Sequence, residues 1–575
     1  MTFSVWAPFA KSVALCLGEQ RVAMQRDSTG TWRTDVPNAQ PGVAYRYSID
    51  DGVALPDPRS RWQPDGVHGD SRMIDVDRLR QVHTIGFKPQ PLHETVIYEM
   101  HVGTFTAEGT YSSARSKLPH LVDLGITHIE MMPLATFPGK HGWGYDGVDL
   151  YAPFPAYGTP QELASFVEAC HAHGLAVLLD VVYNHFGPDG NYLSLYGPYF
   201  TAQWKTAWGD AINYDGPHSD DVRRFIIENA LMWLRDYGFD GLRLDAVHAI
   251  FSFGAIHVLE ELAVAVKELG TETGRTFALI AESDLNDPRL VRPSSRGGYG
   301  LDAHWSDDFH HALHRFFTGE NNGYYADFNG LEDIAIALRE GYIFQGQYSP
   351  HRQHRHGRPP AGLAPHQLVV CSQNHDQIGN RAFGERLSMM LTWPQLKAIA
   401  ALTLLSPFVP LLFQGEEWGA HTPFLYFTDH EDHELGKRVA EGRRKEFGSF
   451  GWKEEVSNPQ QRETFERSKL DWSELSKAEH ADLLAWYQQL IRIRRKKQLI
   501  LKSGTAKVKF DETARWLTYF HSGVLAVFNF SSHPQRIPMP AGEWQLVLSS
   551  IGAEDGGMDQ LPASATRIFE RGKGV

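Results

Sequence analysis

Four short apolar runs, each ending in acidic residues or histidine, place the strongest constraint on how this 575-residue chain can fold. They span residues 174–185, 241–248, 277–284 and 366–376. In the second run, Arg243 and Asp245 share one face of an extended segment, because side chains two apart in a strand point the same way. Charges that face the interior are costly unless they are paired. Taken alone, this pair favours a structural ion pair.

The four runs together favour a catalytic site instead. In a parallel (β/α)8 barrel, the carboxyl ends of all strands lie on one face, where the active sites of such barrels are found. Three acids that follow different runs, Asp245, Glu282 and Asp376, would meet at that face. We therefore predict an α/β fold built on a (β/α)8 barrel.

The order of the other segments supports a barrel, because strand-like and helix-like stretches alternate along the middle of the chain. The first and eighth strands are predicted at Val96–Val102 and Val409–Gln414. A loop rich in glycine and aromatic residues, Phe137–Val148, suits a rigid wall of a ligand site. Residues 348–360 and 416–470 show no period, and we predict a loop and an irregular segment there.

The length predicts more than one domain. Residues 1–85 contain short strand-like runs separated by turn residues, at the spacing of a β-sandwich. Residues 86–500 are predicted to form the catalytic barrel with loop insertions. Alternating residues return in 501–575, which predicts a C-terminal antiparallel β domain.

Composition narrows the possible partners and the cellular location. The formal net charge of −14 argues against nucleic acid or an anionic membrane as a partner. No apolar run is long enough to span a membrane, and we see no signal-peptide pattern at the N-terminus. Cys16, Cys170 and Cys371 have no metal-ligand spacing and predict no disulfide. We therefore expect a cytoplasmic protein.

Four motifs resemble the signature regions of the α-amylase superfamily, in the order in which that superfamily has them. They are Asp180–His185, Gly241–His248, Ala281–Glu282 and Asn374–Asp376. The resemblance implies a glycoside hydrolase that retains the anomeric configuration. It implies that Asp245 is the nucleophile, Glu282 the general acid/base, and Asp376 the carboxylate that stabilises the transition state. Val5-Trp6-Ala7-Pro8 resembles the N-terminal immunoglobulin-like modules of glycogen-active members, which makes the predicted sandwich immunoglobulin-like.

This division of roles agrees with elementary electrostatics. Arg243 beside Asp245 would lower the pKa of that carboxyl and hold it ionised. Glu282 follows a fully apolar strand, and desolvation raises a carboxyl pKa towards the value that a proton donor needs. For a retaining enzyme we predict that the two carboxyl groups lie about 5–5.5 Å apart.

Longer segments resemble one branch of the superfamily, the maltooligosyltrehalose trehalohydrolase family. They are Pro138–Val148, Asn184–Leu193, Glu282–Arg289, Asp307–His311, Asn374–Arg381 and Thr422–His430. The resemblance implies maltooligosyl trehalose as the substrate and trehalose as a product. By the family pattern, the substrate-binding residues are Tyr145, His185, Arg243, Leu244, Ala246, Val247, His248, Asp307, Asp308, Phe309, His310, His311, His375, Gln377, Ile378, Gly379 and Asn380.

The resemblance assigns finer roles to a few of these residues. Tyr145 would stack on a sugar ring, and His185 and His375 would donate to sugar hydroxyls. Asp180 is expected to orient Arg243 rather than to touch substrate. In calcium-dependent amylases, the residue at the position of Asn184 can bind the ion. No acidic cluster would complete such a site here, so we predict no required metal and no cofactor.

Two alternatives remain open, one from the same superfamily and one from another functional class. A glycogen branching or debranching enzyme would share the N-terminal module and the barrel. A non-catalytic glucan-binding protein would lack at least one of the three acids, whereas this chain has all three. The sequence leaves open whether the N-terminal module binds glucan and whether the protein is a monomer or a homodimer.

Overall fold

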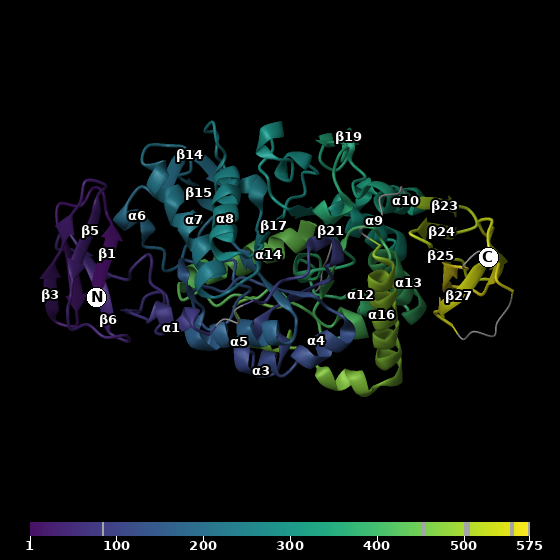
Figure 1. Cartoon of the computed structure of the whole chain (residues 1–575), viewed down its shortest axis with the longest axis horizontal. Coiled ribbons are helices and arrows are strands. Elements are labelled where there is room, and N and C mark those ends of the chain that lie inside the picture. The colour runs from purple at the N-terminus through teal and green to yellow at the C-terminus, as the bar shows by residue number, and fades with distance from the viewer. Residues whose placement is uncertain (83–85, 207, 450–455, 500–505, 552–556, 573–575) are drawn as a thin grey trace.

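A closed barrel of eight parallel strands forms the centre of the molecule in the computed structural model (Figure 1), which describes residues 1–82, 86–206, 208–449, 456–499, 506–551 and 557–572. In chain order the strands are β9 (Ile97–Met100), β10 (His128–Met131), β13 (Ala176–Val181), β16 (Gly241–Leu244), β17 (Ala278–Ala281), β18 (Ala303–Trp305), β21 (Leu368–Cys371) and β22 (Val409–Phe413). β22 pairs with β9 and closes the ring. The predicted (β/α)8 barrel is confirmed.

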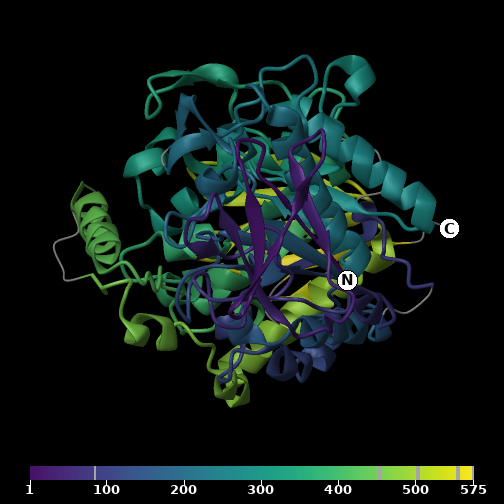
Figure 2. The same ribbon diagram turned by 90° about the vertical axis from the view of Figure 1, so that its left-hand side faces the viewer.

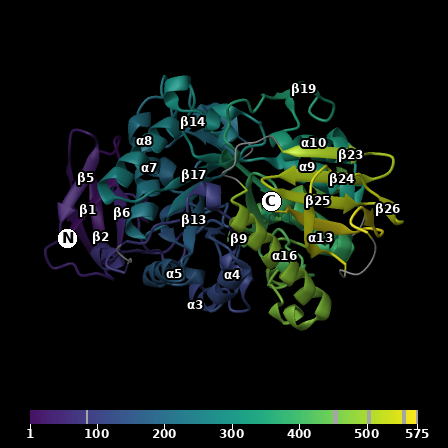
Figure 3. The ribbon, with the colours of Figure 1, turned by 45° about the vertical axis from the view of Figure 1, so that its right-hand side comes forward.

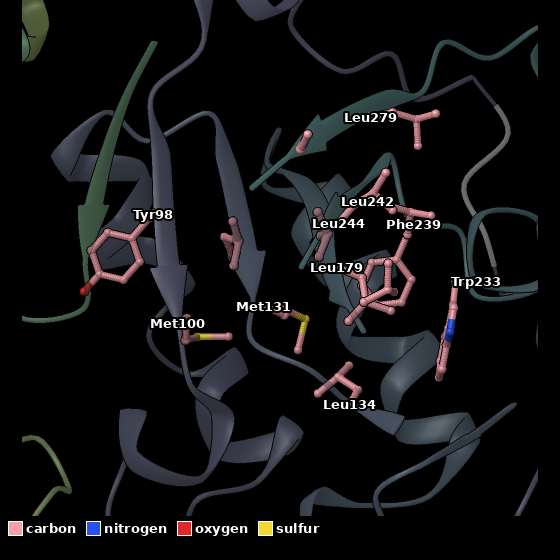
Figure 4. Packing of buried hydrophobic residues seen from close by; sticks show 14 of the residues in the cluster. Tyr98, Met100, Met131, Leu134, Leu179, Trp233, Phe239, Leu242, Leu244 and Leu279 are labelled. Atoms are coloured by element: carbon pink, nitrogen blue, oxygen red, sulfur yellow. The ribbon is translucent and has the colours of Figure 1, made fainter. Parts of the chain in front are cut away.

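Two layers of apolar side chains fix the barrel, because successive strand residues point to opposite faces. Inside the ring, a small cluster contains Ile97, Leu178 and Ile280. Outside it, Leu242, Leu244 and other strand residues pack against the surrounding helices (Figure 4). Fully burying one such side chain contributes about 1.5–3 kcal/mol. The alternation leaves Arg243 and other polar residues on the inner face, at the carboxyl ends of the strands.

Helices surround the barrel (Figure 3). The longer ones are α5 (Pro160–Ala172), α7 (Ser219–Asp236), α8 (Val258–Thr273), α9 (Asp307–Thr318), α10 (Gly330–Glu340), α13 (Trp393–Leu404), α14 (His433–Ser449) and α16 (Ala478–Lys497). The shorter ones are α1 (Val76–Arg80), α2 (Val102–Phe105), α3 (Tyr111–Arg115), α4 (Leu118–Leu124), α6 (Leu193–Tyr196), α11 (His375–Gly379), α12 (Leu387–Met390) and α15 (Arg462–Glu466). None of the helices in the described residues is long and apolar enough to cross a membrane.

The N-terminal residues form two antiparallel sheets at one end of the molecule (Figures 1 and 2). One contains β1 (Thr2–Trp6), β5 (Thr31–Asp35) and β4 (Gln25–Arg26), and the other contains β3 (Gln20–Ala23), β2 (Val13–Leu17), β6 (Ala44–Ile49), β7 (Ala54–Leu55) and β8 (Ser71–Arg72). Trp6 is buried with its ring edge-on to Tyr199, and Arg61 donates to Asp236 at the end of α7. These contacts hold the sheets against the barrel.

The C-terminal residues form an antiparallel sheet at the opposite end (Figure 3). Its strands, in spatial order, are β23 (Lys507–Asp511), β24 (Trp516–His521), β25 (Val524–Asn529), β29 (Thr566–Arg571) and β27 (Trp544–Ser549), with a separate pair β26 (Gln535–Arg536) and β28 (Gln560–Leu561). Lys397 of α13 donates to the Ser550 carbonyl oxygen across 3.2 Å. The proposed domain limits at 85/86 and 500/501 fall at or beside residues outside the described ranges.

The structure corrects two predictions of local structure. The stretch 348–360, predicted as a loop, contributes to a hairpin of β19 (Gln345–Ser349) and β20 (His354–Gly357), whose largely exposed His and Arg residues hid the strand pattern. The irregular segment 416–470 contains α14, a strongly polar helix without a clear apolar period. Between α2 and β10 the chain forms two short helices, α3 and α4, and Pro119 lies in the first turn of α4, where a missing N–H is tolerated.

Three short two-stranded units and the cysteines complete the description. One additional hairpin joins β14 (Phe200–Thr206) to β15 (Gly209–Ile212), and another pair joins β11 (Ala135–Thr136) to β12 (Asp149–Pro153). The third is the β19–β20 hairpin. Cys16, Cys170 and Cys371 are buried free thiols.

Candidate active site

The guanidinium of Arg243 is the centre of a charge network at the carboxyl end of the barrel. Its side chain is 0% exposed. Nη1 donates to both oxygens of Asp180, at 2.9 Å each, and to Oδ1 of Asp245 at 2.7 Å. Nη2 lies 3.7 Å from Oε2 of Glu282. A buried cation of this kind is tolerable only because three carboxyl groups surround it. The prediction that Asp180 orients Arg243 is confirmed.

The turn after β16 ties the Glu282 carboxyl to the Asp245 strand. The backbone N–H of Ala246 donates to Oε2 of Glu282 at 2.6 Å. Ala246 adopts a left-handed conformation with φ of 39°, which is unfavourable for a residue with a Cβ atom. The backbone N–H of Val247 donates to the Glu282 carbonyl oxygen at 3.1 Å. Strained backbone held by such contacts is typical of functional sites.

The pKa values of the two acids move in opposite directions. Burial raises the pKa of Asp245, but Arg243, His185 and a hydrogen bond from Asn184 outweigh it and leave the pKa below its ordinary value. Burial raises the pKa of Glu282 well above its ordinary value, and the charge of Asp245 adds to that rise against the opposing charge of Arg243. The surroundings therefore favour the ionised form of Asp245 and the protonated form of Glu282. This is the division that acid–base assistance to a nucleophile requires.

A second chain of hydrogen bonds leads from Glu99 to Asp180 through His375 and Tyr145. Glu99 on β9 accepts from the backbone N–H of His375 at 2.9 Å and from its Nδ1 at 2.5 Å. On the other side of the ring, Nε2 lies 2.7 Å from the Tyr145 hydroxyl, which donates to Asp180 at 2.5 Å. Burial lowers the pKa of His375, but the carboxylates of Asp376 and Glu99 outweigh it and raise the pKa to about 9. His375 is therefore a cation at neutral pH, donating from both ring nitrogens.

A cleft opens beside this network. It is lined by Glu282, Asp284, Trp305, Asp307, His311, Tyr324, Arg352, Asn374, Asp376, Gln377 and Asn380. The ring of Trp305 lies under Arg243, with 4.3 Å between the guanidinium carbon and the ring centroid. Arg352 of the β19–β20 hairpin donates to Asp284 at 3.1 Å. The acids of the barrel thus face a wall made by inserted loops.

Comparisons with known proteins give the family. The alpha amylase catalytic-domain model matches residues 77–196. A malto-oligosyltrehalose trehalohydrolase from Rhizobium sp. strain M-11 is 48% identical over 580 residues, covering 99% of this chain and 97% of its own length. Another, from Saccharolobus solfataricus, is 44% identical and covers 92% of this chain and 91% of its own length. The chain belongs to the malto-oligosyltrehalose trehalohydrolase family.

Solved structures agree with this membership. A protein from Salmonella typhimurium, provisionally named an alpha amylase, superimposes with a TM-score of 0.90 at 38% identity, covering 99% of this chain and 97% of its own. A pullulanase from Anoxybacillus sp. LM18-11 has a TM-score of 0.72 at 19% identity and shares the fold alone. A branching enzyme from Bacillus cereus is 30% identical over only 53% of this chain. Like its trehalohydrolase relatives, this chain is a glycoside hydrolase of the α-amylase superfamily.

The segment Asp307–His311, which the trehalohydrolase resemblance singled out, is divided between the cleft and the interior. Asp307 and His311 line the cleft. Asp308 accepts backbone N–H groups of Ile343 and Phe344, and His310 donates from Nδ1 to the Ser372 carbonyl oxygen. Phe309 is buried in the outer core with Phe408. Within the described residues these last three side chains have protein partners, so they position the segment.

The segment after Asn374 is divided in the same way. Gln377 and Asn380 line the cleft, whereas Ile378 is buried in an aromatic cluster. A Cβ atom on Gly379 would lie 2.0 Å from the ring of Trp143, so a side chain there would displace that wall. The glycine is thus needed for close packing behind the cleft.

The segment after β16 contributes mainly backbone. Leu244 and Val247 are buried in the outer core, and Ala246 offers its N–H to Glu282. His248 is exposed on the short helical turn Val247–Ala249. In this structure Leu244, Ala246 and Val247 shape the turn, His248 is exposed, and the predicted contacts of this segment with substrate stay a prediction.

Sequence reasoning missed some residues around the site. Trp208, half exposed at the β14–β15 hairpin, stacks on His185 with 4.0 Å between ring centroids. His185 itself lies 3.0 Å from the Tyr145 carbonyl oxygen through Nε2. Tyr324 and Arg352 come from segments that show no periodic pattern. A tryptophan followed by the turn-favouring residues Gly209 and Asp210 was the only sequence signal available for the first, and none marked the other two.

Proposed function

We propose that this chain hydrolyses the α-1,4 bond next to the terminal trehalose of maltooligosyl trehalose, releasing trehalose and a maltooligosaccharide. The observation that carries the chemistry is the shared contact of Arg243 with Asp245 and Glu282, whose pKa values move apart. The substrate comes from the names of relatives that are 44% and 48% identical over nearly the full chain.

In the first step, Glu282 gives its proton to the oxygen that links the trehalose unit. The ionised Asp245 attacks the sugar carbon of the same bond, which breaks as the covalent glycosyl–enzyme forms. Asn184 fixes the attacking carboxylate, donating to its Oδ2 at 2.8 Å and to the Asp245 carbonyl oxygen at 2.9 Å. Trehalose leaves as a neutral alcohol.

In the second step, the Glu282 carboxylate takes a proton from water. The resulting hydroxide equivalent attacks the sugar carbon, and the bond to Asp245 breaks. Asp376, 3.5 Å from Nε2 of His375, carries negative charge beside the sugar that becomes cationic in the transition state. His375 and Tyr145 form the rigid wall of the same subsite, with nearly parallel rings at 5.2 Å.

The leaving-group side of the cleft is proposed to hold the trehalose unit. Arg352 and Asp284 form an ion pair that offers both donors and acceptors to sugar hydroxyls. Among the described residues, no group hydrogen-bonds the buried Nδ1 of His311, and the Tyr324 ring lies 4.5 Å from the His311 ring. The Tyr324 ring and the polar His311 Nδ1 atom, together on one wall of the cleft, suit the binding of a sugar.

Product analysis tests the proposal. The protein is incubated with maltopentaosyl trehalose and, separately, with maltoheptaose and amylose. Free trehalose from the first substrate, with little attack on the other two, is the expected result. New α-1,6 branches in amylose, or no trehalose at all, would move the assignment to a branching-type activity. Inactivity on all three would support a glucan-binding protein.

We further propose a cytoplasmic enzyme, either monomer or homodimer, that needs no metal or other cofactor for hydrolysis. Three buried free thiols fit a reducing compartment. The net charge of −14 disfavours nucleic acid and anionic membranes as partners.

A further inference from the structure

Two histidines and one glutamate that do not line the catalytic cleft meet on segments that follow β22 in the chain. His421 follows the turn after β22, Glu474 lies in the short helix Trp472–Ser476, and His480 lies in the first turn of α16. One ligand atom from each lies within 4.8 Å of the other two. Among the described residues, this is the group of histidine and acidic side chains close enough together to hold a metal ion. Three elements separated in the chain thus offer two imidazole nitrogens and a carboxylate oxygen.

The hydrogen bonds around this cluster leave its ligand atoms available. Nδ1 of His480 lies 2.7 Å from the Trp418 carbonyl oxygen, which can only accept, so Nδ1 carries the proton. In the neutral ring, Nε2 then keeps its lone pair. A histidine whose second nitrogen donates to a carbonyl is the usual arrangement of a metal ligand.

The carboxylate of Glu474 is held in a similar way. Its Oε2 accepts the backbone N–H of His421 at 3.1 Å, and its Oε1 lies 3.6 Å from Nδ1 of the same residue. Glu474 is 7% exposed and His480 is buried, whereas the His421 side chain is 46% exposed. Two ligands are therefore fixed and the third can adjust. Lys477, 58% exposed and 3.7 Å from Oε1, can turn into solvent when a cation replaces it.

We propose that His421, Glu474 and His480 form a binding site for a divalent transition-metal ion, with zinc as the best match. Zinc takes imidazole and carboxylate ligands at about 2.0–2.2 Å, which places tetrahedral ligand atoms about 3.3 Å apart. The ligand atoms lie within 4.8 Å of one another, and the exposed His421 ring has room to move closer to the other two. Water fills the fourth position. Magnesium and calcium, which prefer oxygen ligands, fit this donor set poorly.

The ion has a structural role and takes no part in hydrolysis. It joins the segment after β22 to the start of α16. That segment continues to Thr422, whose carbonyl oxygen accepts from the buried Arg386, and to Phe424, whose ring stacks on Trp143 behind the cleft. Binding to the folded chain alone raises its stability by mass action. The consequence is higher thermal stability with unchanged chemistry.

Zinc titration of the full-length chain, made without a histidine tag and treated with chelator, tests the site. We expect calorimetry to show one zinc ion per chain and the unfolding midpoint to rise by about 2 °C at a hundredfold excess over the dissociation constant. His421→Ala, at an exposed position, should weaken zinc binding at least tenfold and keep the midpoint of the metal-free protein. Glu474→Gln, which can still accept the backbone N–H, should weaken it as well.

A histidine outside the cluster supplies the matched control. His433→Ala, exposed on α14, should bind zinc as the unaltered chain does. Equal affinity in the His421→Ala and His433→Ala proteins, or no zinc-dependent rise in the midpoint, would overturn the proposal. Calcium in place of zinc should give no rise, and an equal rise with calcium would contradict the assignment of the ligand set.

Discussion

The two sides of the cleft are built in different ways. On the side of the proposed chemistry, Arg243, Asp245 and Glu282 stand at or just after neighbouring barrel strands, and their charges are nearly fully buried. On the other side, Arg352 and Tyr324 come from a hairpin and a short helical turn, and the Asp284 side chain that pairs with Arg352 is 39% exposed. Rigid strands hold one side, and inserted loops make the other.

The difference has an energetic meaning. Removing one member of a buried charge network leaves the rest unpaired, at a cost of about 3–5 kcal/mol. A half-exposed pair loses much less, because water replaces the partner. We therefore expect the barrel side to determine whether the reaction occurs, and the loop side to determine which sugar is accepted.

The largest effect should follow from removing the proposed nucleophile. Asp245→Asn cannot form the covalent intermediate, and we expect kcat on maltopentaosyl trehalose to fall by about 10⁴-fold or more. Initial-rate measurements check this, with Asp123→Asn on the exposed face of α4 as the control. A loss below tenfold in a folded variant would remove Asp245 from the chemistry.

The next effect concerns the pH dependence of the proposed proton donor. Glu282 acts protonated and its pKa is raised, so activity should fall as the pH rises through that pKa. Asp245 acts ionised with a lowered pKa, so activity should fall only at acid pH. Glu282→Gln should lower kcat by about 10²–10⁴-fold and flatten the alkaline limb of the pH–rate profile. An unchanged alkaline limb would assign it to another group.

A smaller effect is expected behind the site, at Glu99. Glu99→Gln removes a charge that raises the pKa of His375 to about 9, so His375 should become neutral in part of the range between pH 6.5 and 9. Glu99→Gln removes the charged hydrogen bond to His375, and we expect kcat to fall by about tenfold at pH 8. At pH 6 the fall should be smaller, because His375 stays protonated there without Glu99.

The same substitution predicts a change in stability with pH. A raised pKa in the folded chain contributes stability that is complete below pH about 6.5 and is lost as the pH rises through about 9. Thermal unfolding at pH 6, 8 and 9.5 should show this loss in the unaltered chain and a smaller one in Glu99→Gln. Equal curves for the two proteins would mean that Glu99 does not set the charge of His375.

An effect as small as that of Glu99→Gln should arise on the loop side. Arg352→Ala should lower kcat/KM for maltopentaosyl trehalose by about tenfold, as for loss of one charged hydrogen bond, and leave the slow attack on maltoheptaose unchanged. Competition between the two substrates measures the ratio. Arg355→Ala, exposed on the same hairpin, is the control and should change neither rate. Equal losses on both substrates would place Arg352 in general glucan binding.

Much of the barrel side could be predicted because the sequence patterns that reveal it lie within short stretches of the chain. A buried strand followed by a charged residue is visible in sequence, and the strand period put Arg243 and Asp245 on one face with Leu242 and Leu244 on the other. The structure confirms that arrangement. The predicted separation of the Asp245 and Glu282 carboxyl groups, about 5–5.5 Å, remains a prediction.

The loop side could not be predicted because its contacts are distant in the chain and its segments are polar. Arg352 meets Asp284 across 68 positions, from a hairpin that sequence reasoning treated as a loop. Asp308 and His310 belong to a matching motif, yet their partners are backbone and side-chain groups of other protein segments. A motif therefore identified the right segment without separating residues that face the sugar from residues that hold the segment.

The anomeric form of the first product tests the central claim most directly. Proton NMR during the first minutes of maltopentaosyl trehalose hydrolysis distinguishes the α and β forms of the new reducing end before they interconvert. Attack by Asp245 followed by water predicts the α form first, because two displacements restore the configuration. The β form first would show a single displacement by water, and would contradict the assignment of Asp245 as nucleophile.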